Sequence, residues 1–298
     1  MAAISSMATA ASILIAGLFH GAALFLLTSG LQLSFGVQRI VNLACGSIYA
    51  LGAYLGVSVT TWALAQGLPV PLFPLVLLAS GLVAGLIGLP LERVLSTIYR
   101  RPESFQLLLT FSLILIFQDV LRFFWGAYPR QLPNVSMVYG SINVGGVQMP
   151  MYNLFVILAA VVIGVGLTWF LSHTTSGKVL RATAENRETS AAMGVNVRLV
   201  YLLVFTLGTT LSTVGGVLVV PTAAASLQMG VELVVDAFAV IVIGGLGSMK
   251  GAAVGAVIVG LIRAAALFIY PEVDVLATYA VVLIVLIWWP TGLFGKAL

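Results

Sequence analysis

Charged side chains are scarce in this chain, and the stretch 172–198 holds the densest group of them. Basic and acidic residues are interspersed there: Lys178, Arg181, Glu185, Arg187, Glu188 and Arg198. Small and apolar residues lie between them, as in short helices on a membrane surface, and Gly194 is suited to end the second helix. The pattern alone leaves two interpretations open: a solvated loop, or a docking element that fits a groove on a partner protein.

A second set of polar residues lies within apolar segments. A polar group is costly in hydrocarbon unless it is paired or lines a water-filled path. The segment 30–52 contains Asn42 and Tyr49 among glycines that allow a helix to break, so both are candidates for a solute pathway. Arg39 fits either this pathway or a first cytoplasmic turn, and Cys45 is interpreted as a small packing residue rather than a reactive thiol.

Arg263 lies roughly 18 Å along its predicted helix from Gly251, at 1.5 Å per residue. A cation at that depth indicates function, although it could instead extend outward to pair with Glu272 and Asp274. Asp119, Glu232 and Asp236 are placed near segment ends, where local pairing or interfacial anchoring explains them.

Motifs for catalysis or nucleotide binding are absent from the sequence. The glycine-rich stretch 244–251 lacks the residue order of a phosphate-binding loop, so this chain is not expected to bind ATP itself. His20 and His173 are far apart, and no hydrolase or metal-site pattern accompanies them. We expect no catalytic residue, no metal and no cofactor on this chain, which leaves transport or channel function.

The elements that carry these residues are apolar helices. Hydrophobic residues make up 61% of the 298 residues and charged residues 7%, against roughly 25% charged in a soluble domain. The apolar runs are continuous, which predicts helices rather than the alternating strands of a barrel. They lie at about 12–34, 44–66, 70–90, 105–125, 152–172, 199–221, 234–247, 251–270 and 275–291.

The predicted fold class is therefore all-α, a polytopic transmembrane helical bundle of about eight or nine membrane segments with at least one broken helix. The short run 234–247 and its neighbour 251–270 are interpreted either as two segments or as one broken helix. No separate soluble domain is visible, so residues 1–298 are predicted to form a single transmembrane domain.

The distribution of Lys and Arg predicts the orientation. Eight of the 13 basic residues fall on loops assigned to one side: Arg93, Arg100, Arg101, Lys178, Arg181, Arg187, Arg198 and Lys296. Placed in the cytoplasm, they leave the N-terminus outside, the loop 126–151 outside with irregular, turn-rich structure, and the C-terminus inside. These loops also explain the net charge of +4, so the lipid bilayer is expected as a partner and nucleic acid is not.

Three stretches together resemble the permease family of branched-chain amino-acid ABC importers. The run from Gly30 to Tyr54 resembles the family's first signature, and the run from Ala237 to Gly255 resembles its late glycine-rich signature. The run from Pro290 to Gly295 fits near the end. In the charged loop, Glu188 and Gly194 keep the spacing of the family's coupling motif, although Thr189 and Ser190 stand where two alanines are expected. The chain departs from the family at Cys45, where His is usual, and at Arg263, near which an acidic residue is common.

The resemblance implies a role for three groups of residues. Coupling of the loop at about 172–198 to an ATPase is assigned to Arg181, Glu185, Glu188, Ala192 and Gly194. The substrate pathway is assigned to Asn42, Cys45, Gly46, Tyr49 and Arg263. Helix packing or a gate is assigned to Gly244, Gly245, Gly247, Ser248, Gly251 and Gly255. Small-residue spacing of this kind serves close packing within the chain or against a second permease.

The implied function is that of a permease subunit in the bacterial inner membrane that imports a small polar solute. Branched-chain or other neutral amino acids are the favoured solutes. Relatives handle urea, amides or small carboxylates, which stay open as alternatives. The implied partners are two ATPase subunits that carry the ATP and Mg²⁺, a homologous permease or second copy, and an extracytoplasmic binding protein. A stand-alone channel or secondary transporter is the alternative of another class.

Overall fold

A computed structural model describes residues 2–40, 42–69, 72–99, 101–132, 139–144, 147–289 and 291–295. Arg100, Pro290 and Lys296, which entered the sequence-based predictions, lie outside these ranges, as does part of the loop 126–151.

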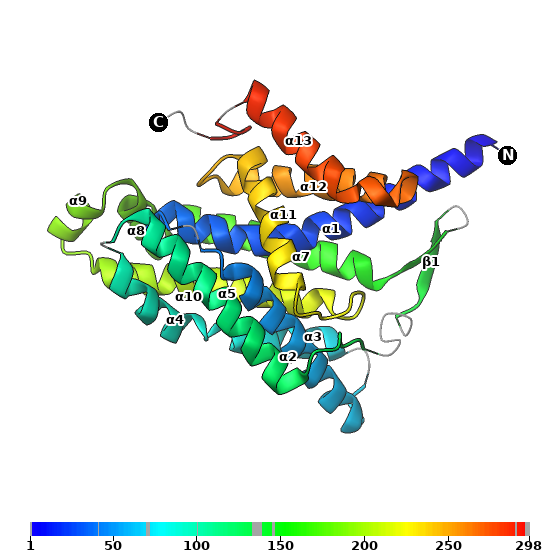
Figure 1. Cartoon of the computed structure of the whole chain (residues 1–298), viewed down its shortest axis with the longest axis horizontal. Coiled ribbons are helices and arrows are strands. Elements are labelled where there is room, and N and C mark those ends of the chain that lie inside the picture. The colour runs from blue at the N-terminus through cyan, green and yellow to red at the C-terminus, as the bar shows by residue number, and fades with distance from the viewer. Residues whose placement is uncertain are drawn as a thin grey trace.

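The described chain is an all-α bundle with one small β-hairpin (Figure 1). Its helices are α1 Ala2–Gln38, α2 Cys45–Ala65, α3 Phe73–Gly85, α4 Gly88–Leu95, α5 Glu103–Trp125, α7 Tyr152–His173, α8 Thr175–Glu185, α9 Arg187–Ala192, α10 Val197–Val219, α11 Met229–Gly244, α12 Met249–Ile269 and α13 Asp274–Trp288. Short 3₁₀ turns occupy Ser96–Ile98 and Pro271–Val273. The hairpin pairs β1 Ser141–Val144 with β2 Val147–Pro150 in antiparallel register, within the loop predicted to be irregular.

Seven helical stretches in the described ranges are long and apolar enough to cross a membrane: Ala10–Gln38, Cys45–Ala65, Phe73–Ile98, Ser104–Trp125, Tyr152–His173, Val197–Val219 and Met249–Ile269. Helices α11 and α13, of 16 and 15 residues, are shorter. The predicted all-α transmembrane bundle is confirmed, with these two short helices accounting for the approximate segment count.

Helix breaks divide the spans in two places. Helix α1 ends at Gln38 because Arg39 takes a left-handed conformation with a φ of 55°, and α2 begins only at Cys45. The span Phe73–Ile98 is interrupted by turns between Gly85 and Gly88. The second break falls inside the predicted apolar run 70–90, whereas α1 extends four residues beyond the predicted run 12–34.

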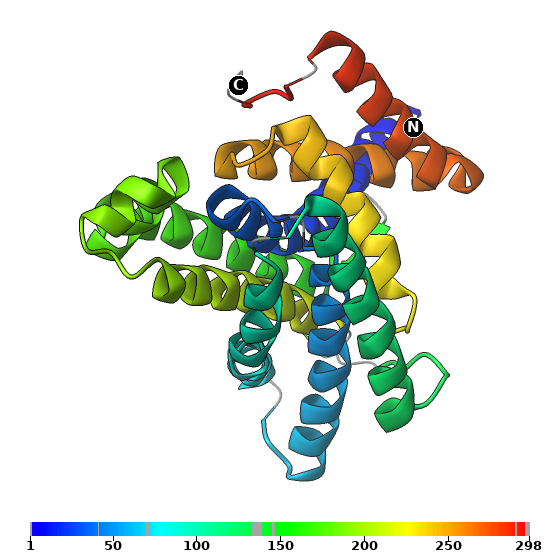
Figure 2. The ribbon, with the colours of Figure 1, turned by 60° about the vertical axis from the view of Figure 1, so that its left-hand side comes forward.

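Helix α10 forms the centre of the bundle, between α1, α2 and α3. Backbones come unusually close there because glycines face it: Gly30 lies against the Gly208 carbonyl, and Gly52 against the Thr213 backbone. The Thr213 hydroxyl donates to the Gly81 carbonyl at 2.7 Å, and the Thr209 hydroxyl to the Gly85 carbonyl at 2.9 Å. Helix α13 lies at one edge of the bundle and α3–α4 at the opposite edge (Figures 1 and 2).

The interpretation of 234–247 and 251–270 as one broken helix is wrong. Helices α11 and α12 are separate and pack against each other beside the turn that joins them, with Gly244 against Gly251 and Gly255 against the Val240 carbonyl. Positive φ angles at Gly245 and Gly247, 96° and 77°, allow this turn, and only glycine adopts both without strain.

Candidate functional site

A cavity of about 490 Å³ lies where α1, α2, α11 and α12 meet the segment between α10 and α11. Its polar lining comes from residues distant in sequence: His20, Tyr49, Asn153, Thr222, Ser226, Glu232 and Arg263. The Tyr49 hydroxyl and the Asn153 Oδ1 are buried and have no hydrogen-bond partner among the described residues. Buried polar groups are nearly always satisfied, so these two atoms are available to a water or a polar solute.

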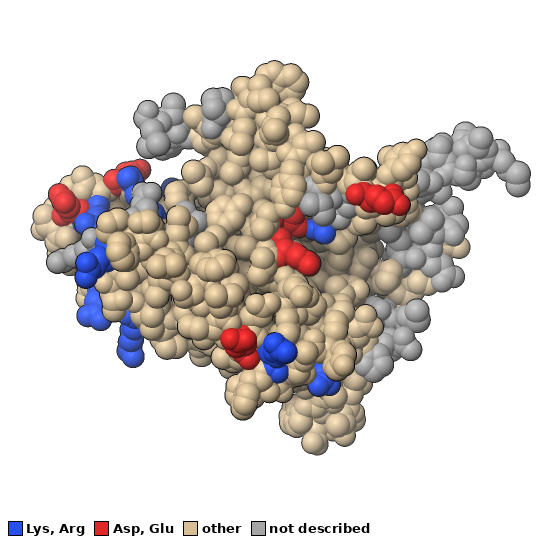
Figure 3. Space-filling model, in the orientation of Figure 1, with Lys and Arg blue, Asp and Glu red and all other residues tan. Residues whose placement is uncertain are grey.

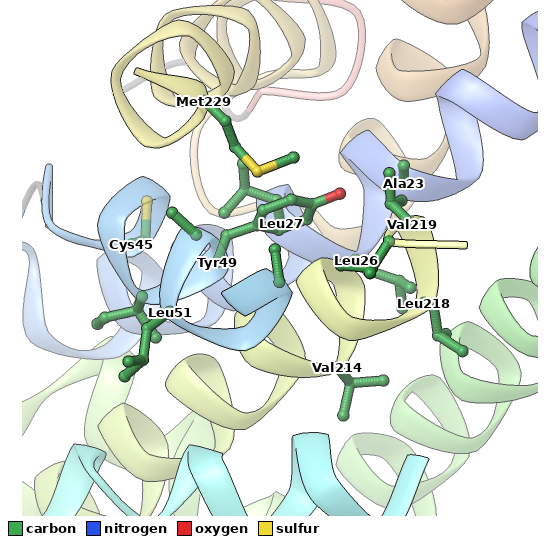
Figure 4. Packing of buried hydrophobic residues seen from close by; sticks show 14 of the residues in the cluster. Ala23, Leu26, Leu27, Cys45, Tyr49, Leu51, Val214, Leu218, Val219 and Met229 are labelled. Carbon is green, nitrogen blue, oxygen red and sulfur yellow. The ribbon is translucent and has the colours of Figure 1, made fainter. Parts of the chain in front are cut away.

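Tyr49 is held by close packing rather than by hydrogen bonds. Its side chain is 1% exposed, and its ring lies 2.9 Å from the position that a Cβ on Gly215 would occupy. Figure 4 shows the ring directed from α2 toward Ala23 of α1, with Met229 beside it and Cys45 on the far side. The glycines of α10 therefore make room for an aromatic ring whose hydroxyl faces the cavity.

The first turns of α2 and α11 meet inside the bundle. Gly46 and Gly230 lie backbone to backbone, and a side chain on either residue would collide with the other's carbonyl. Asn42, 3% exposed, precedes α2 and accepts a hydrogen bond on Oδ1 from the Ala44 N–H at 3.1 Å. The starts of α2 and α11 are therefore held against each other by direct backbone contact.

Arg263 forms an ion pair with Asp236 in the cavity wall, between α12 and α11. This partner on the facing helix is not one of the two that the sequence offered, Glu272 and Asp274, and the side chain of Asp274 lies outside the described part of the chain. The placement of Asp236 near a segment end is wrong: it lies in the middle of α11 and is 9% exposed. The pair is only partly buried, at 26% and 13% side-chain exposure, and of the two residues Arg263 lines the cavity.

The five predicted pathway residues do not all reach this cavity. Tyr49 and Arg263 line it. Asn42, Cys45 and Gly46 are buried behind it, at the start of α2. Arg39 is exposed in the turn just after the end of α1 and does not line the cavity.

The glycine-rich turn between α11 and α12 is held by a residue that the sequence did not single out. Gln32 of α1, 1% exposed, donates from Nε2 to the Gly245 carbonyl at 2.9 Å and accepts on Oε1 from the Gly247 N–H at 2.7 Å. Ser248 then caps α12 by accepting from the Gly251 N–H at 3.1 Å. A lone Gln in an apolar run is the only sequence signal for this clamp.

The C-terminal motif packs against the same turn. The Leu293 N–H donates to the Ile243 carbonyl at 2.8 Å, and the Phe294 N–H to the Gly244 carbonyl at 3.0 Å. These carbonyls end α11 and have no partner within the helix. Gly292 and Gly295 allow the close approach to Gly245, so the tail closes the end of α11.

A further polar network joins the end of α1 to the turn after α4. Glu92, 2% exposed, accepts from the Tyr99 hydroxyl at 2.9 Å. Gln38 donates to the Tyr99 oxygen at 3.4 Å and to the Tyr201 carbonyl at 2.9 Å. Burial and then the nearby Glu92 carboxylate raise the pKa of Tyr99 above its usual value, so this hydroxyl remains a donor at neutral pH.

The charged stretch 172–198 forms the two short helices predicted for it. Thr174 caps α8 and Asn186 caps α9, each accepting from a backbone N–H, at 3.0 and 2.9 Å. Gly194, with a φ of 86°, follows the end of α9. Arg181, Glu185, Glu188, Ala192 and Gly194 are all exposed, and Met193 is 81% exposed. Figure 1 shows α8 and α9 together at one end of the bundle, and Figure 3 shows Lys and Arg gathered there.

Within the described ranges, no three His, Cys, Asp or Glu side chains gather as a metal site would require. What the arrangement offers is a polar cavity between helix starts, a clamped glycine turn and an exposed pair of helices. These are features of a multi-span helical membrane protein, and a polar cavity between helix starts suits passage of a small solute.

The comparisons with known proteins name the family. Residues 13–287 match the model for the permease component of the branched-chain amino acid transport system, and the chain belongs to this family. It is thus a transport permease subunit and not itself an enzyme.

Two relatives span nearly its whole length. The chain is 26% identical over 292 residues to the high-affinity branched-chain amino acid transport system permease protein BraD of Pseudomonas aeruginosa, covering 95% of each chain. It is 24% identical over 291 residues to the corresponding LivH of Salmonella typhimurium, covering 94% of each. Among solved structures, a chain of PsaBC from Streptococcus pneumoniae in complex with Fab matches at 14% identity with a TM-score of 0.46, over 91% of this chain and 90% of that one.

Proposed function

We propose that this chain is the permease subunit of an ATP-driven importer in the bacterial inner membrane, and that residues 1–298 form its single transmembrane domain. Its solute is a small zwitterion, and branched-chain or other neutral amino acids are the favoured candidates. Two ATPase subunits bind and hydrolyse ATP with Mg²⁺, a homologous permease or second copy completes the path, and an extracytoplasmic binding protein delivers the solute.

The exposed α8–α9 pair carries this proposal. An uncovered Met193 beside Glu188, at the tip of two capped helices, suits insertion into a groove on a partner protein. Gly177 and Leu180 of α8 pack toward the bundle. Because α8 contacts α9, α7 and α10, a displacement of α9 can be transmitted through α8 to those two longer helices. Arg181, Glu185, Glu188, Ala192 and Gly194 are the contact residues we assign to the ATPase.

The cavity beside Tyr49 and Arg263 supports the translocation path. Its volume of about 490 Å³ accommodates a small solute, and its unsatisfied hydroxyl and amide oxygen can orient one. Asn42, Cys45 and Gly46 support this wall from behind. The turn of Gly244, Gly245, Gly247 and Ser248, with Gly251 and Gly255 packed beside it, is assigned to the gate.

The gathering of Lys and Arg at the α8–α9 end supports a cytoplasmic location for that end. The N-terminus then lies outside and the C-terminus inside. Family membership favours an importer over a stand-alone channel or secondary transporter, and selectivity among amino acids, amides, urea and small carboxylates remains with the binding protein.

Co-expression with the ATPase and permease subunits of the same system tests the proposal. We expect the tagged chain to retain both, and reconstituted solute flux to require ATP. Exchange of Gly194 for Leu should abolish ATP-dependent flux while the chain still folds. Purification without any ATPase, together with flux that is indifferent to ATP, would falsify the proposal.

A further inference from the structure

A second cavity, of about 540 Å³, opens between α1, α7 and α12. It is distinct from the polar cavity, because the two have no lining residue in common, although α1 contributes to both. Its lining combines small residues with larger apolar ones, including Phe25, Val161, Val165 and Val257. Helix α7, which forms one wall, is the least buried of the candidate spans, with 11% of its apolar window buried.

Polar residues lie at one end of this groove only. Ser172, His173 and Lys250 line that end, and the His173 ring stacks on Trp169 at 6.2 Å between centroids. Arg181 of α8 donates to the Ser172 carbonyl at 3.2 Å. A second cation therefore lies at the same end of the groove as Lys250. The opposite end, near Leu18 and Ile157, is apolar.

The dimensions of the groove suit a single hydrocarbon chain. From Ile157 to His173 the groove runs roughly 24 Å along α7, at 1.5 Å per residue. A single hydrocarbon chain, about 4 to 5 Å wide at carbon contact distance, occupies roughly 300 to 500 Å³.

We propose that this groove binds an anionic phospholipid, with an acyl chain between α1, α7 and α12 and the phosphate at Lys250, Ser172 and His173. The apolar walls exclude a polar solute, and the lysine at one end complements a negative headgroup. Assignment of the headgroup to the cytoplasmic leaflet rests on the orientation proposed above; lipid binding itself does not.

Native mass spectrometry of the purified chain, with phosphatidylglycerol or phosphatidylcholine added, tests the proposal without ATPase or transport. We expect Lys250→Gln to lower the preference for phosphatidylglycerol about fivefold, the value of one basic residue near a charged surface. The matched control is Arg187→Gln, which removes a cation from exposed α9 outside the groove. Equal preference in the Lys250 variant and wild type contradicts the headgroup site.

Filling the groove tests the acyl chain separately. Val161→Trp should reduce retention of both lipids, whereas Val162→Trp should not, because Val162 is similarly exposed, at 61% against 55%, but does not line the groove. Should Val161→Trp leave lipid retention unchanged, or instead disrupt self-association of the chain in size-exclusion measurements, the groove is not a lipid site. Because the assay uses no ATPase, a failed importer proposal would leave these results unaffected.

Discussion

The α8–α9 pair and the start of α2 differ in how they are held. Each helix of the pair has a local cap, from Thr174 and Asn186, and its outer face touches nothing in the described chain. The start of α2 is held by distant backbone, with Gly46 against Gly230. We infer that the first region is stable enough to be presented to a partner, while the second depends on the packing of the whole bundle.

The largest effect should come from filling the contact at α2. Gly46→Leu places a side chain on the Gly230 carbonyl, and neither backbone can move away. We therefore expect the free energy of unfolding to fall by at least about 3 kcal/mol, which would leave little folded protein. Thermal unfolding in detergent, followed by size-exclusion chromatography, measures this. Gly166→Leu is the control, since nothing lies within 4 Å of that helical glycine. Equal stability of the two variants would mean that α2 and α11 do not meet.

Removal of one partner of the Arg263–Asp236 ion pair should have the second-largest effect on stability. Arg263→Met removes the cation that pairs with Asp236. We expect the free energy of unfolding to fall by about 2 kcal/mol, which is less than for a fully buried pair because both side chains are partly exposed. The double variant Arg263→Met, Asp236→Leu should recover most of it in the same unfolding assay. Arg122→Met, at an exposed site on α5, should change little. Additive losses in the double variant would show that the two residues are not coupled.

Loss of the Gln32 clamp should lower the free energy of unfolding by as much as loss of the ion pair, or by less. Gln32→Leu leaves the Gly247 N–H without its partner and the Gly245 carbonyl with only the longer bond from the Ser248 N–H, at 3.3 Å. We expect the free energy of unfolding to fall by about 1–3 kcal/mol, the cost of an unsatisfied buried group. Gln66→Leu, at the exposed end of α2, is the matched control. If both variants unfold at the wild-type temperature, the turn is held by other contacts.

What the sequence could predict follows the same division. The spans, the two short helices and the glycine at the end of α9 all depend on local patterns, and each was predicted. The ion pair of Arg263 with Asp236, the Gln32 clamp and the tail across α11 join residues 27 to 215 positions apart. Hydropathy and cap residues contain no signal for such pairings. For this reason only the sequence neighbours Glu272 and Asp274 were considered as partners of Arg263, and the division of 234–270 into one helix or two stayed open. Tyr49 was found through its unusual polarity, but its cavity was not.

The smallest effect on stability is expected on α9. Glu188→Lys reverses an exposed charge and should change the free energy of unfolding by less than about 0.5 kcal/mol. It should nevertheless abolish stimulation of the partner ATPase by solute-loaded binding protein. Glu272→Lys, an exposed acidic site at the opposite end of the bundle, should leave stimulation unchanged. Normal ATPase stimulation in the Glu188 variant would remove this residue from the coupling surface.

Thiol labelling at the tip of α9 tests the central proposal most directly. Cys45, the only native cysteine, is buried, so a cysteine introduced at Met193, 81% exposed, can be followed by its reaction with a soluble maleimide. Addition of the ATPase subunits should slow labelling of Met193→Cys by about tenfold or more, because the centre of a protein interface excludes solvent. Tyr128→Cys, at an 84% exposed site near the opposite end, should keep its rate. Unchanged labelling of Met193→Cys in the assembled complex would contradict the assignment of α8–α9 as the surface that receives the ATPase.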